Sequence, residues 1–226
     1  MRGLQPRSPA AKGVERRAAT PLAGAIAGIL FAALFSISVA IMVTSVQDLA
    51  TDTGAWLETD AGRFKFAVGL IPFAGLFFLW FIAVARERLG RYEDQFFSTV
   101  FLGSGLLFLA MIFAAAASAG AMVAAYTKDP AAFAASTTYV YARQVFAQIF
   151  NVYALRMAAV FLISQATLWL RTGVMPKWLA YATYVVALVL LFVTTQEIWV
   201  VLVLPAWVFL ISVYILIAYL KPGTAA

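Results

Sequence analysis

The chain contains six long runs of apolar residues that are almost free of charged side chains. A helix that crosses a membrane needs about 20 such residues, because the hydrocarbon core is about 30 Å thick. Of the 226 residues 64% are hydrophobic and 12% are charged, whereas soluble domains are about half apolar and a quarter charged. We therefore predict an all-α polytopic membrane protein, a bundle of six transmembrane helices. The predicted helices cover residues 21–46, 65–85, 96–126, 139–171, 178–193 and 198–220.

The segments outside these runs are short. Residues 1–20 contain five Lys or Arg and one Glu, and we predict a basic arm without regular structure. The bundle then covers residues 21–221, and 222–226 form a tail. Residues 47–64 are predicted to form the longest loop. The run 21–46 exceeds the apolar core of a signal peptide, which is about 7 to 15 residues long, so we expect it to remain as a signal anchor.

The basic residues predict an orientation. With the N-terminus inside, inner segments hold eleven Lys or Arg and outer segments hold four. Lys and Arg accumulate on the cytoplasmic side of membrane proteins. Both termini are therefore predicted to be cytoplasmic. The net charge of +6 then reflects topology, and we expect membrane lipids and no nucleic acid as partners.

The chain has no Cys and no His. Disulfides, thiolate chemistry, His-ligated haem, His or Cys zinc sites and His general bases are thereby excluded. No Asp or Glu falls within a predicted span, so the carboxylate of an intramembrane proton relay is absent as well. We predict no catalytic residue, no metal and no cofactor.

The predicted helix 139–171 is the most polar of the six. Gln144, Gln148, Asn151 and Gln165 fall within an arc of about 100° on a regular α-helix. Because amides without partners are costly in lipid, we expect this face to point into the bundle or into a wet cavity. With Arg156 at its edge, this face is the candidate substrate-binding site.

Arg156 has two interpretations. Counted back from Arg171, its backbone lies about 22 Å from the inner boundary and about 8 Å below the outer one. It can therefore extend outward to the headgroups, or pair with an outer acid such as Glu197. Alternatively it is functional, since an Arg beside amides suits an anionic or zwitterionic solute or headgroup.

Small residues recur at helix spacing in two of the runs. Gly24 and Gly28 form a GxxxG pair, and a Gly-Ser-Gly triplet occupies residues 103–105. Such residues let helices approach closely. They predict tight packing within the chain, with a membrane-protein partner or in a homo-oligomer.

Two classes of function remain open. The first is a non-enzymatic protein, either a permease-like protein for small solutes or ions or a subunit of a membrane complex. The second is a membrane-embedded enzyme or lipid-binding protein that acts on lipid headgroups. The candidate acids of such an enzyme would be Glu93, Asp94 and Glu197, which lie in predicted loops.

Three blocks carry a resemblance: PFAGLFFLWFIAVARERLGRYEDQFFSTVFLGSGLLF (72–108), YALRMAAVFLIS (153–164) and PAWVFLISV (205–213). They resemble a group of uncharacterised multi-pass membrane proteins of bacteria, chiefly actinobacteria. The resemblance implies six helices and the bacterial cytoplasmic membrane. It implies no role for any residue.

Overall fold

A computed structural model describes residues 9–46, 54–89, 95–134, 136–192 and 198–220, and every element within these ranges is helical. The long helices are α1 (Pro9–Ser45), α2 (Trp56–Leu89), α3 (Gln95–Lys128), α6 (Leu155–Thr172), α7 (Lys177–Phe192) and α8 (Val203–Leu220). The shorter elements are α4 (Pro130–Ala134), α5 (Thr138–Ala147), the π-helix η1 (Gln148–Ala154) and the 3-10 helix η2 (Ile198–Leu202).

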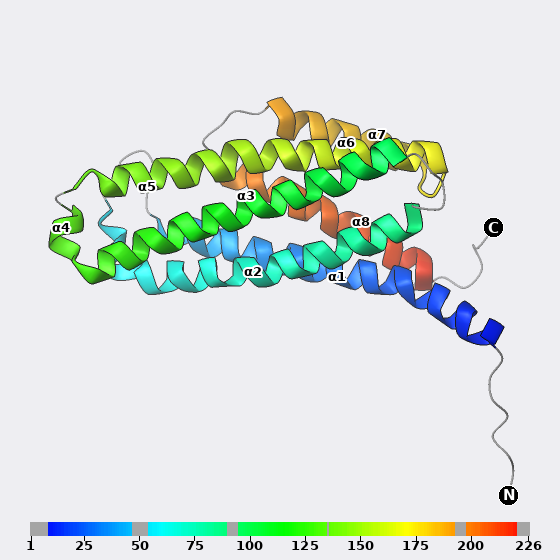
Figure 1. The fold of residues 1–226 in the computed structure, drawn as a ribbon, viewed down its shortest axis with the longest axis horizontal. Helices are drawn as coiled ribbons and strands as arrows, with labels where there is room; N and C mark the ends of the chain where they lie inside the picture. Colours follow the sequence, from blue (N-terminus) through cyan, green and yellow to red (C-terminus); the bar gives the residue numbers. More distant parts are fainter. Residues whose placement is uncertain (1–8, 47–53, 90–94, 135, 193–197, 221–226) are drawn as a thin grey trace, which may run out of the picture.

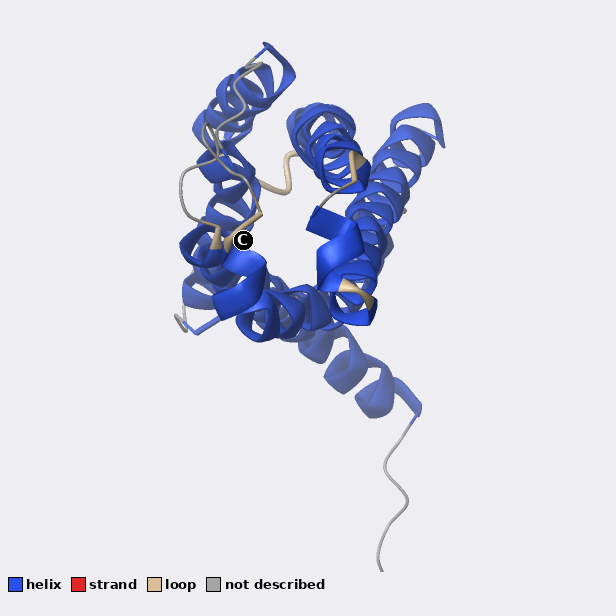
Figure 2. Cartoon of the chain, turned by 90° about the vertical axis from the view of Figure 1, so that its left-hand side faces the viewer, coloured by secondary structure: helices blue, strands red, loops and turns tan. Residues whose placement is uncertain are grey.

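The long helices lie side by side and alternate in direction, with α5, η1 and α6 forming one continuous rod (Figure 1). We call the end where α1 begins and α8 ends the terminal end, and the opposite one the α4 end. Helix α1 packs on α2 and α8, α3 packs on α2 and α6, and α7 packs on α6. Figure 2 shows the same bundle from the α4 end.

Five of the helices are long and apolar enough to cross a membrane: Leu22–Ser45, Trp56–Arg86, Phe96–Lys128, Thr138–Thr172 and Val200–Leu220. The sixth predicted span corresponds to α7, whose 16 residues extend for about 24 Å at 1.5 Å per residue. The all-α class and a membrane-embedded protein are therefore supported, with five candidate spans in the described part of the chain.

Several predicted boundaries were wrong. The predicted arm is helical from Pro9, since α1 begins there. The second half of the predicted loop 47–64 belongs to α2, which begins at Trp56. The loop predicted after residue 126 contains the helix α4. In each case helix continues into polar sequence, where hydropathy gives no signal but the backbone still forms hydrogen bonds.

Aromatic rings fill the centre of the bundle. The ring of Phe78 on α2 lies 4.6 Å from that of Phe31, 5.2 Å from that of Phe108 and 5.3 Å from that of Phe161, between centroids. These partners come from α1, α3 and α6, and all four rings are buried. One cluster therefore joins four helices.

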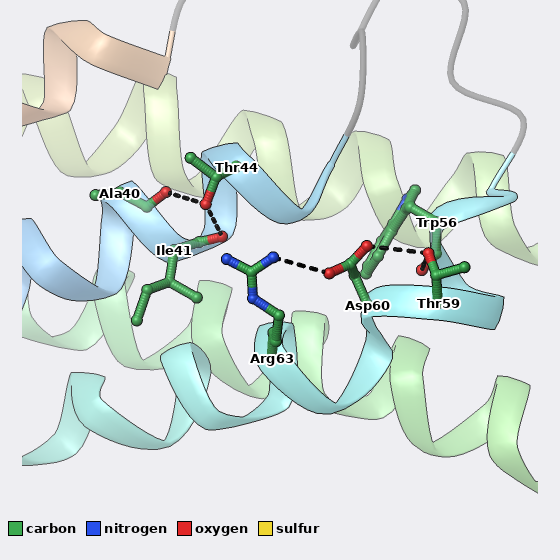
Figure 3. Close-up of polar contacts among 7 residues, drawn as sticks. All are labelled: Ala40, Ile41, Thr44, Trp56, Thr59, Asp60 and Arg63. Carbon is green, nitrogen blue, oxygen red and sulfur yellow. Dashed lines mark hydrogen bonds and ion pairs between the residues drawn. The ribbon is translucent and has the colours of Figure 1, made fainter.

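Polar contacts order the α4 end. Thr44 donates its hydroxyl to the carbonyl of Ala40 at 2.9 Å, and Arg63 Nη1 donates to Asp60 Oδ1 at 3.1 Å (Figure 3). Asp129 Oδ1 accepts from the N–H of Ala132 at 3.0 Å and caps α4, whose first residue is Pro130. Among the described residues of this end, local contacts thus cap α4 and tie side chains of α1 and α2 to their own helices.

A buried hydrogen bond joins α2 to α5 at the same end. Trp56 Nε1 donates to the hydroxyl of Tyr139 at 3.0 Å, and the side chains are 6% exposed. Tyr139→Phe leaves the indole N–H buried without its partner. We expect the free energy of unfolding to fall by about 1–2 kcal/mol. SDS titration of the purified protein in mild detergent measures this loss.

Tyr141→Phe is the matched control, because Tyr141 lies on the same helix and is 72% exposed. We expect its free energy of unfolding to stay within about 0.5 kcal/mol of the wild type. Equal effects of the two substitutions would show that the bond contributes nothing to stability.

Candidate functional site

The most polar helical run is interrupted in its middle by a π turn. The predicted helix 139–171 consists of α5, the seven-residue π-helix η1 (Gln148–Ala154) and α6. A π turn bonds residue i to i+5 and accommodates about one extra residue, which shifts every later residue by about 100° around the axis. The prediction of a regular α-helix over 139–171 was therefore wrong.

This shift rearranges the predicted polar face. In a regular helix Arg156 lies about 120° from Gln144 and about 80° from Gln148; after the π turn it falls between them, about 20° from each. The same shift rotates Gln165 away from this face, to about 160° around the helix axis from Gln144 and from Gln148. The face thus loses Gln165 and gains Arg156.

Exposure agrees with this geometry. Gln144 and Gln148 are exposed, Arg156 is half-buried, and Asn151 and Gln165 are buried. The prediction that all four amides share an inward face was wrong, since only Asn151 and Gln165 point inward. Within the described part of the chain, their oxygens, Asn151 Oδ1 and Gln165 Oε1, have no hydrogen-bond partner.

Arg156 folds back along its own helix. Its Nη1 donates to the carbonyl oxygens of Asn151 at 3.4 Å and Val152 at 3.3 Å. Both carbonyls belong to the π-helix, and that of Val152 also accepts the backbone N–H of Leu155. The guanidinium is therefore directed toward the α4 end.

The hydrogen bonds of Arg156 to described residues use only part of the capacity of its guanidinium. A guanidinium has five N–H donors, and the two contacts above come from Nη1 alone. No carboxylate of the described residues pairs with it. Glu197, the predicted partner, lies outside the described residues.

Gln165 lines a cavity at the terminal end, far from Arg156. The cavity has a volume of about 50 Å³ and lies between α1, α2, α6, α8 and the turn that follows α6. Gln165 is fourteen residues beyond Asn151, about 20 Å along the helix. The predicted site is thus two places, one around Arg156 and Asn151 and the other around Gln165.

The turn that closes this cavity ends α6 sharply. Gly173 has φ +66° and its N–H bonds to the carbonyl of Trp169 at 2.9 Å, a left-handed helix cap. The next residues, Val174 and Met175, line the cavity. Nothing in the sequence predicted which residues form these walls. The one sequence signal of a cavity here was Gln165, a single polar residue within an apolar stretch.

The candidate acids of an enzyme, Glu93, Asp94 and Glu197, all lie outside the described residues. Among the residues that are described, no three acidic side chains gather into a possible metal site.

Comparison of the chain with protein-family models, with curated proteins and with solved structures gives no match.

Proposed function

We propose that the protein is a permease-like protein of the bacterial cytoplasmic membrane that binds a small anionic or zwitterionic solute at the external boundary through Arg156. The observation that supports this is the guanidinium itself: it is held at the π turn by the carbonyls of Asn151 and Val152, and no carboxylate of the described residues pairs with it. An ionisable side chain within a span is costly, and an Arg with free donors binds carboxylate or phosphate.

Six spans with both termini inside are part of this proposal. Helix α7 returns from the terminal end along α6, and the hydroxyls of Thr167 and Tyr184 lie 2.6 Å apart between them. From the other side, Trp207 Nε1 of α8 donates to Thr183 Oγ1 at 3.2 Å. A short helix held on two sides can cross by local thinning of the bilayer.

The level of the site follows from helix length. If Arg171 marks the inner boundary, a hydrocarbon core of about 30 Å extends back about 20 residues, to Asn151. Gln144 and Gln148 then lie in the headgroup region and in water, where exposed amides cost little. Arg156, whose guanidinium reaches toward Asn151, lies just beneath them and can receive a solute from outside.

The test is uptake of tracer anions into proteoliposomes. We expect the wild type to take up at least one of phosphate, sulfate, acetate or glutamate faster than empty liposomes do. Arg156→Leu should lower that uptake at least tenfold, because the donors that recognise the anion are lost. Arg156→Lys keeps the charge without the planar fork and should give an intermediate rate.

Lys128→Gln is the control for net charge. Lys128 is exposed in the last turn of α3, at the α4 end. The substitution therefore removes one positive charge from the end of the bundle toward which Arg156 points. We expect it to leave uptake unchanged. Wild-type uptake no faster than in empty liposomes for all four anions would refute the permease-like function; equal uptake by Arg156→Leu would refute the site.

A further inference from the structure

The cavity at the terminal end has mostly apolar walls, and the described side chains that bring polar groups to its lining are Gln165, with its amide, and Trp169, with its indole N–H. Gly24, Phe81, Val84, Trp169 and Met175 are among its walls, and of the described residues that line it Gln165 alone supplies a side-chain oxygen. That oxygen, Gln165 Oε1, is buried without a partner, in a residue that is 2% exposed. An amide in this state leaves hydrogen-bonding capacity directed at whatever occupies the cavity.

Water fits this cavity poorly. A buried water is held by two to four polar partners, and here the described lining offers the amide of Gln165 and the indole N–H of Trp169 among otherwise apolar side chains. An apolar chain that carries a single polar group fits better, because it fills the enclosure and also meets the amide. Rotation of the terminal amide exchanges Oε1 and Nε2, so Gln165 can donate to an ester carbonyl as well as accept from a hydroxyl.

Two cations are close in the chain to residues that line the cavity. Arg86 directly follows Ala85, and Lys177 comes two residues after Met175; Ala85 and Met175 both line the cavity. Arg86 and Lys177 are exposed, and neither forms an ion pair with a described residue. The rim of the cavity therefore offers positive charge to an anionic group.

The depths of these groups match one lipid molecule. Gln165 lies six residues before Arg171, about 9 Å deeper than the helix end, while Arg86 and Lys177 lie at the ends of their helices. Each headgroup region is about 5–7 Å thick. With the phosphate at the level of the helix ends, the ester lies about 2–4 Å nearer those ends than the backbone of Gln165, and the first carbons of the acyl chain lie beside Gln165.

We propose that this cavity binds one acyl chain of an anionic phospholipid from the leaflet at the terminal end, with Gln165 hydrogen-bonded to its ester and Arg86 and Lys177 at its phosphate. The site is independent of Arg156, which lies toward the other end of the same helical run. It gives the protein a bound lipid that joins α1, α2, α6 and α8.

Native mass spectrometry of the delipidated full chain tests this, with palmitoyl-oleoyl phosphatidylglycerol and phosphatidylcholine added at equal concentration. We expect the wild type to retain phosphatidylglycerol at least fivefold more than phosphatidylcholine. Arg86→Gln combined with Lys177→Gln should reduce this preference to less than twofold. Both side chains are exposed, so the double variant should fold normally. Equal retention of the two lipids by the wild type would overturn the proposal.

Gln165→Leu tests the deep contact. It keeps the volume of the side chain and should weaken retention of both lipids about tenfold, the effect of one lost hydrogen bond in an apolar site. Gln148→Leu, an exposed amide on the opposite face of the same run, should change nothing. Arg156→Leu should also leave lipid retention unchanged. A negative result for the lipid site can therefore be distinguished from a negative result for the proposed solute site. Unchanged or tighter retention by Gln165→Leu would refute the role of the amide.

Discussion

Phe78→Ala is expected to lower the free energy of unfolding by about 2–3 kcal/mol, somewhat less than the roughly 3–5 kcal/mol that buried Phe→Ala costs in soluble proteins. Phe78 is 0% exposed and contacts rings from α1, α3 and α6. Lipid tails are as apolar as the core, so little transfer energy is lost. The cost comes from the cavity, whose lining loses dispersion contacts.

Phe73→Ala is the matched control, since Phe73 lies on the same helix and is 61% exposed. Its ring leaves no cavity when it is removed, because lipid fills the space. SDS titration in mild detergent should show a large shift for Phe78→Ala and a shift below about 0.5 kcal/mol for Phe73→Ala. Similar shifts for both would mean that the central cluster is not what holds the four helices together.

Gly28→Ala is expected to cost about 1–3 kcal/mol through overpacking. A Cβ at Gly28 would lie 3.0 Å from the ring of Phe81 on α2 and would overlap the hydroxyl of Ser212 on α8. Neither neighbour can move freely, because Phe81 is 3% and Ser212 0% exposed. The contact faces of α1 with both α2 and α8 would have to separate.

Ser212→Ala provides a rescue. Ser212 Oγ is buried without a partner, so its removal alone should be neutral or stabilising. In the Gly28→Ala background it removes the closest clash, and we expect it to restore at least half of the lost stability. A double-mutant cycle in SDS titration measures the coupling.

Gly103→Ala is the control for glycine itself. Gly103 lies within α3, and a Cβ there would meet no atom within 4 Å. Alanine should then stabilise the helix by up to about 1 kcal/mol. A loss of stability at Gly103, or none at Gly28, would contradict the assignment of Gly28 to helix packing.

The small-residue spacing of α1 illustrates what a pattern leaves open. Gly24 and Gly28 predicted a close approach of another helix, either within the chain or from a partner. In the folded chain their neighbours are Val84 of α2 and Ser212 of α8. Spacing shows that a helix can approach closely, whereas the identity of that helix depends on how all the helices pack.

The candidate site shows a similar division. Its residue types and its place on the fourth predicted span were evident, because polar side chains are conspicuous in an apolar run. Their grouping was not, because one π turn rotates Arg156 toward Gln144 and Gln148 and rotates Gln165 away. A π turn has no strong composition signal. In the folded chain Phe150, which lies within it, stacks on Phe35 of α1 with centroids 6.2 Å apart.

The sequence by itself determined the helical membrane class, the approximate position of each apolar helix and the absence of Cys and His chemistry, because hydropathy and residue type are local properties. The tertiary structure decided the phase of the polar face, the neighbours of the glycines and the cavity around Gln165. These depend on hydrogen-bond register and on side chains far apart in the chain. Local pattern therefore fixes which helices form, and packing fixes which of their faces meet.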